Sequence, residues 1–252
     1  MADTRSAKNK IREEVWRRLE ENNVAAFPRP VYGRIPNFVG AREAAARITR
    51  LREWRSADIV KANPDAPQRW LREAALLEGK KLLMATPRLR EGFLLLDPAR
   101  IPASMLRRAA TIRGAFSLGQ KIGLRRLREE IGVIDIIVAG SVAVDKRGRR
   151  VGKGEGYAEI EYAVLRELGL VDEHTPIVTT IHDLQLVDEV PREPYDLTLD
   201  YAATPTRLLR FTNREPRPPG VIWSLLSCKK YREIPVLQEL AKTRGVKPPC
   251  DA

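Results

Sequence analysis

Short apolar runs alternate with helical patterns along this chain, and the alternation restricts the fold more than any other feature. Residues 57–61 and 81–85 have strand character, and residues 68–78 between them have apolar side chains at helical spacing. Strand, helix and strand in this order form the βαβ unit of a parallel sheet. Apolar runs at 134–139 and 176–180 have the length and β-branched content of further buried strands. We predict an α/β fold with a mostly parallel sheet.

The remaining segments predict helices and loops around that sheet. Helical patterns cover residues 4–22, 41–54 and 229–242, and the last is amphipathic, with Tyr231, Ile234, Leu237 and Leu240 facing inward. Prolines and glycines make residues 27–40 a loop, and residues 221–223 are expected to form a short strand. We find no internal repeat, so residues 1–252 are predicted to form a single domain with the 27–40 loop as an insertion.

A glycine-rich, basic stretch lies between the 134–139 run and a helical pattern at 157–168. Gly152, Gly154 and Gly156 alternate just before the expected helix, where unpaired N–H groups and the helix dipole favour an anion. Cationic side chains from Arg149, Arg150 and Lys153 flank this backbone. The spacing matches neither the Walker A nor the Rossmann pattern. It predicts either a phosphate-binding loop or a basic surface turn.

Residues 150–159 resemble the ATP loop of the 5-formyltetrahydrofolate cyclo-ligase family, whose pattern is close to R-x-G-x-G-x-G-Y-Y-D. Arg150, the three glycines and Tyr157 match it, whereas Ala158 and Glu159 depart from it. A longer branch, the methenyltetrahydrofolate synthetase domain-containing proteins, shares the strings G-S-V-A-V, G-K-G-E-G-Y-A and D-Y-x-x-T-P-T-R with this chain. The resemblance implies a three-layer cyclo-ligase fold, related to ribose-5-phosphate isomerase and CoA transferases. It implies ATP- and Mg²⁺-dependent conversion of 5-formyltetrahydrofolate to 5,10-methenyltetrahydrofolate.

The resemblance also implies roles for individual residues. The family's N-terminal K-x-x-x-R corresponds to Lys8 and Arg12, which lie one helical turn apart. The implied ATP ligands are Lys8, Arg12, Arg150, Gly152, Lys153, Gly154, Glu155, Gly156 and Tyr157. Lys153 and Tyr157 are also implied to be catalytic, and Tyr157 to line the substrate side.

Metal and substrate ligands follow from the same comparison. The string E-P-Y-D-L-T-L-D-Y places Asp196 and Asp200 near the site, and Asp200 is expected to bind Mg²⁺ together with Glu159. The family uses a glutamate after its first strand to recognise folate, and here only Asp65 and Gln68 stand in that region as substrate-binding candidates. His182, at the end of the 176–180 strand, is either a buried structural histidine or an acid–base group.

Composition excludes several classes of protein and leaves one competitor. No apolar run reaches the length of a membrane span, and the charged N-terminus differs from a signal peptide, so we expect a cytoplasmic protein. The two cysteines lack metal-ligand spacing and are expected to be free thiols. The net charge of +12 also fits an RNA-binding protein without catalytic activity. The missing folate glutamate leaves a further alternative, an ATP-dependent enzyme acting on another heterocycle, such as a thiamine-related compound.

Overall fold

The computed structural model describes residues 2–247 and 249–250 and centres on a sheet of eight strands. These strands are β1 (Ile59–Ala62), β2 (Lys81–Ala85), β3 (Phe93–Leu96), β4 (Gln120–Ile122), β5 (Ile136–Val138), β8 (Ile177–Thr180), β10 (Tyr201–Ala203) and β11 (Leu208–Arg210). Neighbouring strands in the series β10-β8-β5-β1-β2 are parallel, and β11, β3 and β4 add antiparallel edges. The predicted mostly parallel sheet is confirmed.

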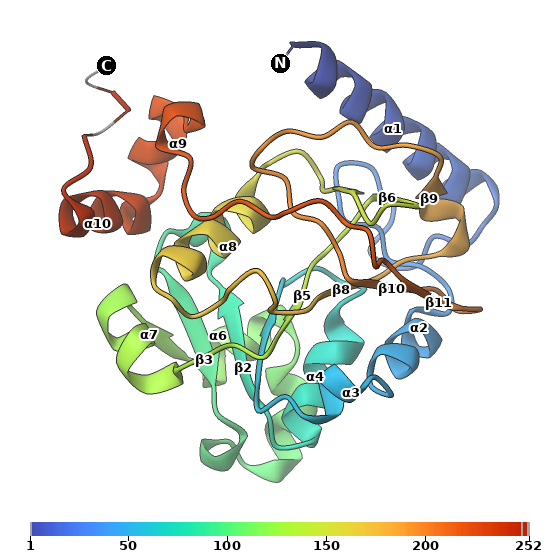
Figure 1. Cartoon of the computed structure of the whole chain (residues 1–252). Coiled ribbons are helices and arrows are strands. Elements are labelled where there is room, and N and C mark those ends of the chain that lie inside the picture. Colours follow the sequence, from blue (N-terminus) through green and yellow to red (C-terminus); the bar gives the residue numbers. More distant parts are fainter. Residues whose placement is uncertain (1, 248, 251–252) are drawn as a thin grey trace.

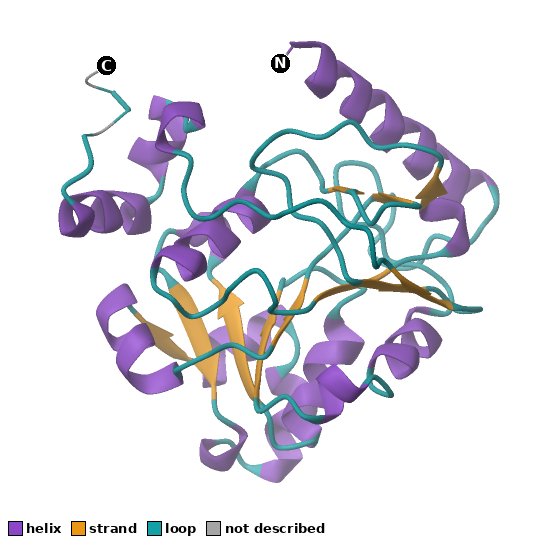
Figure 2. Ribbon diagram, viewed as in Figure 1, coloured by secondary structure: helices purple, strands orange, loops and turns teal. Residues whose placement is uncertain are grey.

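Helices cover both faces of this sheet and complete three layers (Figure 1, Figure 2). One face packs against α2 (Ala41–Ile48), α3 (Arg52–Arg55), α4 (Arg69–Leu77), α5 (Leu106–Ala109) and α6 (Ile112–Leu118). The other packs against α7 (Leu124–Ile131), α8 (Tyr157–Glu167) and α10 (Pro235–Arg244). Side chains alternate between the two cores along each strand, so Ile59 faces the α8 side and Val60 the α4 side. This alternation also directs the polar Lys61 toward α8.

A smaller unit packs beyond the carboxyl ends of the central strands. Helix α1 (Ala2–Glu21) lies beside a three-stranded sheet of β7 (Arg150–Val151), β6 (Ala143–Asp145) and β9 (Leu186–Val187) (Figure 1). The 27–40 loop completes its core with Val31 and Ile35. In the described part of the chain, neither α1 nor any other helix is long and apolar enough to cross a membrane.

The C-terminal region differs from two sequence predictions. The helix expected over residues 229–242 is two helices, α9 (Cys228–Glu233) and α10, which meet at Pro235. Proline lacks the N–H that a continuous helix requires and drives the preceding residue out of helical geometry, and Ile234 has φ −117° and ψ 95°. The strand expected at residues 221–223 is absent from the described structure, where a single 3-10 turn spans Trp223–Leu225.

Nearer the N-terminus, the helix expected over residues 41–54 is also interrupted, at residues 49–51, and forms α2 and α3.

The two cysteines form a disulfide, so the prediction of free thiols is wrong. Cys228 opens α9 and Cys250 lies in the C-terminal tail, with their Cα atoms 4.9 Å apart. The turn between α9 and α10 brings this tail back to α9, and sequence spacing alone does not reveal such a return.

Candidate functional site

The candidate site lies where β1 and β5 end side by side. The chain continues from β1 toward one sheet edge and from β5 toward the other, and ligands in open α/β sheets bind at such a switch point. Asn63 joins the two strand ends, because its backbone N–H donates to the Val138 carbonyl at 3.0 Å. Its side-chain Oδ1 accepts the Gly140 N–H at 3.1 Å. Loops from both strands are therefore fixed at one place.

The glycine-rich loop runs from β7 to the start of α8 above this switch point. Gly154 and Gly156 have φ values of +100° and +71°, in a region that side-chain-bearing residues rarely adopt. Gly156 is the N-cap of α8 and supplies no side-chain hydrogen bond, which leaves the first N–H groups of an 11-residue helix for another partner. An anion is the partner that this geometry favours.

Two cations frame the loop. The Arg12 Nε atom donates to the Gly152 carbonyl at 2.7 Å, and a Cβ atom on Gly154 would lie 3.4 Å from the Arg12 Cζ. The Lys153 Nζ lies 2.9 Å from a Glu155 oxygen and 4.0 Å from an Asp65 oxygen. Burial lowers the pKa of Lys153, but the Asp65 and Glu155 carboxylates outweigh burial and raise that pKa overall. Lys153 therefore stays protonated beside the loop.

The other two cationic residues predicted to bind phosphate, Lys8 and Arg150, are each paired with a carboxylate. The Lys8 ammonium binds the Asp196 carboxylate, and both side chains are largely buried. The Arg150 guanidinium binds Glu159 and donates to the Gly140 carbonyl at 2.7 Å, and its side chain is 0% exposed. Arg150 of β7 thus lies beneath the loop and joins the segment after β5 to α8, a placement that supports a positioning role more than phosphate contact.

The predicted substrate-binding pair lies after β1. Burial raises the pKa of the Asp65 carboxyl, although the nearby Lys153 charge opposes the shift. Gln68 is 0% exposed, and neither of its amide atoms has a hydrogen-bond partner among the described residues. A buried amide without partners costs free energy, which suits a group reserved for a ligand. The backbone here is held from below by Arg72, whose Nη1 donates to the carbonyls of Asn63 and Asp65.

Comparisons with known proteins show the family to which this fold belongs. Residues 4–205 match the model of the 5-formyltetrahydrofolate cyclo-ligase family. The chain belongs to this family. The structure of Aquifex aeolicus 5,10-methenyltetrahydrofolate synthetase has the same fold, with a TM-score of 0.50 and 18% identity, and the match covers 82% of this chain and 94% of that one. The predicted family and three-layer cyclo-ligase fold are thus confirmed.

Longer relatives match nearly the whole chain. The methenyltetrahydrofolate synthase domain-containing proteins of Mus musculus and Homo sapiens are 43% and 40% identical over 238 and 239 residues, which is 93% of this chain. The chain spans 63% and 61% of their lengths. A 5-formyltetrahydrofolate cyclo-ligase of Mycolicibacterium smegmatis is 33% identical over 79 residues, which is 31% of this chain and 38% of that protein.

One predicted metal ligand of this family member lies elsewhere. Asp200 directly precedes β10, at the amino-terminal edge of the sheet, opposite the edge that carries the glycine-rich loop. Its carboxylate binds the guanidinium groups of Arg214 and Arg217 and accepts the Ile177 N–H at 2.7 Å. Asp200 therefore anchors the C-terminal segment, and the prediction that it joins Glu159 at one metal site is wrong. The carboxylate placed near Glu159 is that of Asp196. Burial raises the pKa of Asp196, the Lys8 charge opposes this shift, and the negative charge of Glu159 adds to it.

His182 has a structural role in this geometry. Its Nδ1 accepts the Leu184 N–H at 3.2 Å, which caps a short 3-10 turn. Burial lowers its pKa, so the neutral ring is favoured. Of the two alternatives for His182, the structure supports the structural histidine, although its side chain is half-buried.

A buried ion pair beneath the site was missed by sequence reasoning. The Lys61 Nζ of β1 lies 2.5 Å from the Glu161 Oε2 of α8, and the Asn63 Nδ2 donates to the same oxygen at 2.9 Å. Lys61 and Glu161 are 1% and 5% exposed. A lysine inside the otherwise apolar string I-V-K-A was the available signal, because an unpaired lysine is rarely fully buried. The pair fixes the start of α8, and with it the glycine-rich loop, over the end of β1.

Proposed function

We propose that the chain catalyses ATP-dependent ring closure of 5-formyltetrahydrofolate to 5,10-methenyltetrahydrofolate. The observation that carries the proposal is the glycine-rich loop, which leads into α8 at the switch point between Arg12 and Lys153. Membership of the cyclo-ligase family supports the same conclusion. A reduced folate is accordingly the proposed substrate, and ATP is the proposed phosphoryl donor.

In this reaction the formyl oxygen takes the terminal phosphoryl group, the second amine of the folate, which lies outside the pterin ring, attacks the activated carbon, and phosphate leaves. The protein's contribution is to position the two substrates and to stabilise charge. The loop N–H groups, Arg12 and Lys153 would bind the phosphates, and Tyr157 would line the substrate side. Asp65 and Gln68 would bind the heterocycle, since a carboxyl and an amide can together donate and accept hydrogen bonds.

Mg²⁺ would be bound at this site mainly by the phosphates of the nucleotide, with few ligands from the protein. No group of three or more His, Cys, Asp or Glu side chains among the described residues is arranged to hold a metal. Mg²⁺ commonly takes one or two carboxylates together with substrate phosphates, so Glu159 and Asp196 would suffice. When bound, the ion would neutralise phosphate charge during transfer.

Ligand-induced stabilisation tests the proposal, because a ligand that binds only the folded state raises the unfolding midpoint. We expect ATP with Mg²⁺ to raise the midpoint of the wild type but not of Lys153→Ala. Lys146→Ala is the matched control, since Lys146 is exposed on the turn between β6 and β7. Formation of the methenyl product, followed by its absorbance, then tests the substrate. A midpoint that neither ligand shifts at saturation would refute the proposal.

The second candidate is an ATP-dependent enzyme for another heterocycle, such as a thiamine-related compound. The specific observation in its favour is Gln68, a neutral amide in the region where the family uses a glutamate. In this case ATP would stabilise the protein and 5-formyltetrahydrofolate would not.

RNA binding without catalysis is favoured only by the net charge of +12. It predicts an affinity that falls steeply with salt and does not respond to ATP.

A further inference from the structure

The segment beyond residue 205 lies outside the family match but returns to the candidate site. Its helix α9 places the Lys230 Nζ 3.5 Å from the centroid of the Tyr157 ring. Tyr157 is the first residue of α8 and directly follows the glycine-rich loop. A C-terminal helix therefore supplies a cation to the side of the site opposite Arg12, which approaches the loop from α1.

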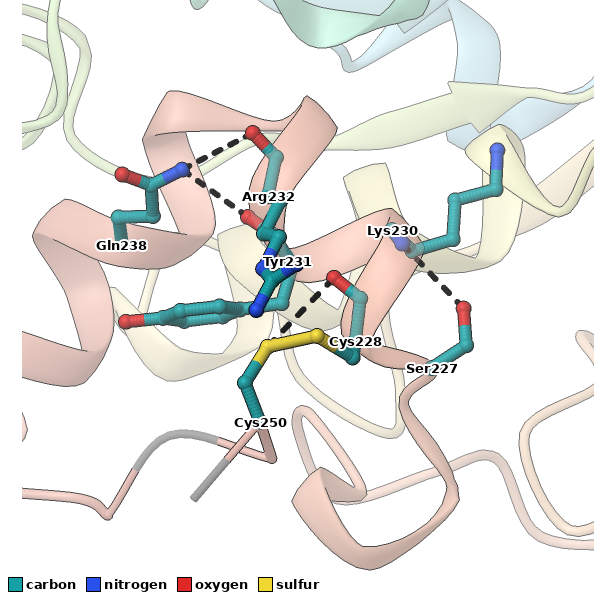
Figure 3. Close-up of a disulfide and its surroundings, with 7 residues drawn as sticks. All are labelled: Ser227, Cys228, Lys230, Tyr231, Arg232, Gln238 and Cys250. Atoms are coloured by element: carbon teal, nitrogen blue, oxygen red, sulfur yellow. Dashed lines mark hydrogen bonds between the residues drawn. A yellow bond between two sulfur atoms is a disulfide. The ribbon is translucent and has the colours of Figure 1, made fainter.

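Lys230 is held in this position from both ends of α9. On the N-terminal side, the Ser227 hydroxyl accepts the Lys230 backbone N–H at 3.3 Å, and the disulfide ties Cys228 to Cys250 (Figure 3). On the C-terminal side, the Gln238 Nε2 of α10 donates to the carbonyls of Tyr231 and Arg232, each at 3.1 Å.

The α10 helix is itself anchored in the core beside α8. Ile234 and Leu237 are both 0% exposed and belong to the same apolar cluster as α8 side chains. A flexible lysine on a rigid support can reach a ligand at little cost in backbone entropy.

The charge of Lys230 is satisfied differently from that of the other cations at the site. Lys8, Arg150 and Lys153 each lie against a carboxylate, whereas the Lys230 ammonium lies over the aromatic face of Tyr157 and makes no ion pair with a carboxylate of the described residues. A cation over a tyrosine ring is held weakly enough to exchange that contact for an anion. Such an anion would lie on the Tyr157 side of the site, away from Arg12.

We propose that Lys230 is a substrate-binding residue whose ammonium binds a carboxylate carried by the second substrate, on the Tyr157 side of the site. This proposal rests on the proposed cyclo-ligase function and refines it, because the enzyme would recognise an acidic tail of the substrate in addition to its heterocycle. The phosphates of ATP are the other possible anion, and they would bind at the loop between Arg12 and Lys153.

The test compares Lys230→Met, Lys230→Arg and the neighbouring control Lys229→Met, whose side chain is exposed. We expect Lys230→Met to raise the KM for 5-formyltetrahydrofolate roughly 10- to 100-fold, the range of a hydrogen bond between charged groups. The kcat and the KM for ATP stay within about threefold, and the arginine variant restores most of the affinity. Thermal midpoints near that of the wild type show that the variants fold.

Equilibrium binding of 5-formyltetrahydrofolate, and of an analogue that lacks the acidic tail, completes the test. Wild type and Lys230→Met should bind the tailless analogue equally, because the missing carboxylate is the group that Lys230 contacts. An unchanged KM for folate, or a raised KM for ATP instead, overturns the assignment of Lys230 while leaving the proposed function intact. A wild type that neither binds nor converts 5-formyltetrahydrofolate refutes the proposed function, and this proposal with it.

Discussion

Replacing Lys61 with methionine tests how strongly the buried ion pair beneath the site stabilises the fold. Lys61 and Glu161 join β1 to α8 across the α8 face of the sheet and are almost fully shielded from water. Removal of one partner leaves the other charge buried and uncompensated, which costs about 3–5 kcal/mol of unfolding free energy. This loss is a large part of the 5–15 kcal/mol that typically stabilises a domain.

The double variant Lys61→Met with Glu161→Met separates the charge effect from the rest. Two apolar side chains of similar size leave no unpaired charge, so the charge penalty disappears. The Asn63 Nδ2 then loses its acceptor, which costs about 1–3 kcal/mol. We therefore expect the double variant to be destabilised by about 1–3 kcal/mol, well below the sum of the two single variants.

Urea unfolding of the four proteins at neutral pH measures this cycle. The exposed pair Arg126–Glu130 of α7 is the control, and its removal should cost only about 0.3–0.5 kcal/mol. The reasoning is refuted if Lys61→Met costs less than about 1 kcal/mol, or if the double variant loses as much as both single variants together.

Three further predictions concern the loop, the disulfide and the pH dependence. Gly154→Ala places a side chain on a backbone with φ of +100° and next to Arg12, so it should lower the free energy of unfolding, measured with urea, by about 1–2 kcal/mol. The same variant should bind ATP more weakly in calorimetry, and an unchanged ATP affinity would contradict the prediction. Cys228→Ser should lower the free energy of unfolding, measured with urea under oxidising conditions, by about 3 kcal/mol, because the disulfide closes a loop with a sequence separation of 22. Wild type with its disulfide reduced should be as stable as this variant. Burial raises the pKa of Asp65, so the folded state favours the neutral carboxyl. The stability that this preference contributes is present at low pH and is lost as the pH rises through the raised pKa. Asp65→Asn should therefore unfold at a higher urea concentration than wild type at pH 7, and this difference should shrink toward pH 4.

Local patterns in the sequence were sufficient for the parts of the site that depend on neighbouring residues. The alternating glycines predicted the loop, and the structure places them between β7 and α8 with two positive φ angles. The four-residue spacing of Lys8 and Arg12 predicted a shared face, and both side chains reach the site from α1. These inferences hold because helix and turn geometry is set over a few residues.

Contacts between distant residues could not be predicted in this way. Lys8 and Asp196 are 188 positions apart, and Lys61 and Glu161 are 100 apart. Asp196 and Asp200 show the difficulty most clearly, because they are only four residues apart and yet have different surroundings. The extended chain between them crosses from α1 to the opposite edge of the sheet, and four extended residues cover about 13 Å. Which aspartate faces the loop depends on where β10 begins, and strand boundaries are the least certain feature of a sequence pattern.

The charges around the loop explain why a nucleotide would need a cation there. Around the loop itself, the charges of Lys8, Arg12, Arg150 and Lys153 are balanced by those of Asp65, Glu155, Glu159 and Asp196. A polyphosphate entering this balanced cluster gains attraction from Arg12 and Lys153 but meets repulsion from the carboxylates that already hold Lys8 and Arg150. A divalent ion between the phosphates and Glu159 would turn that repulsion into attraction. The net charge of the whole chain therefore says little about this site, because the local balance determines the affinity for an anion.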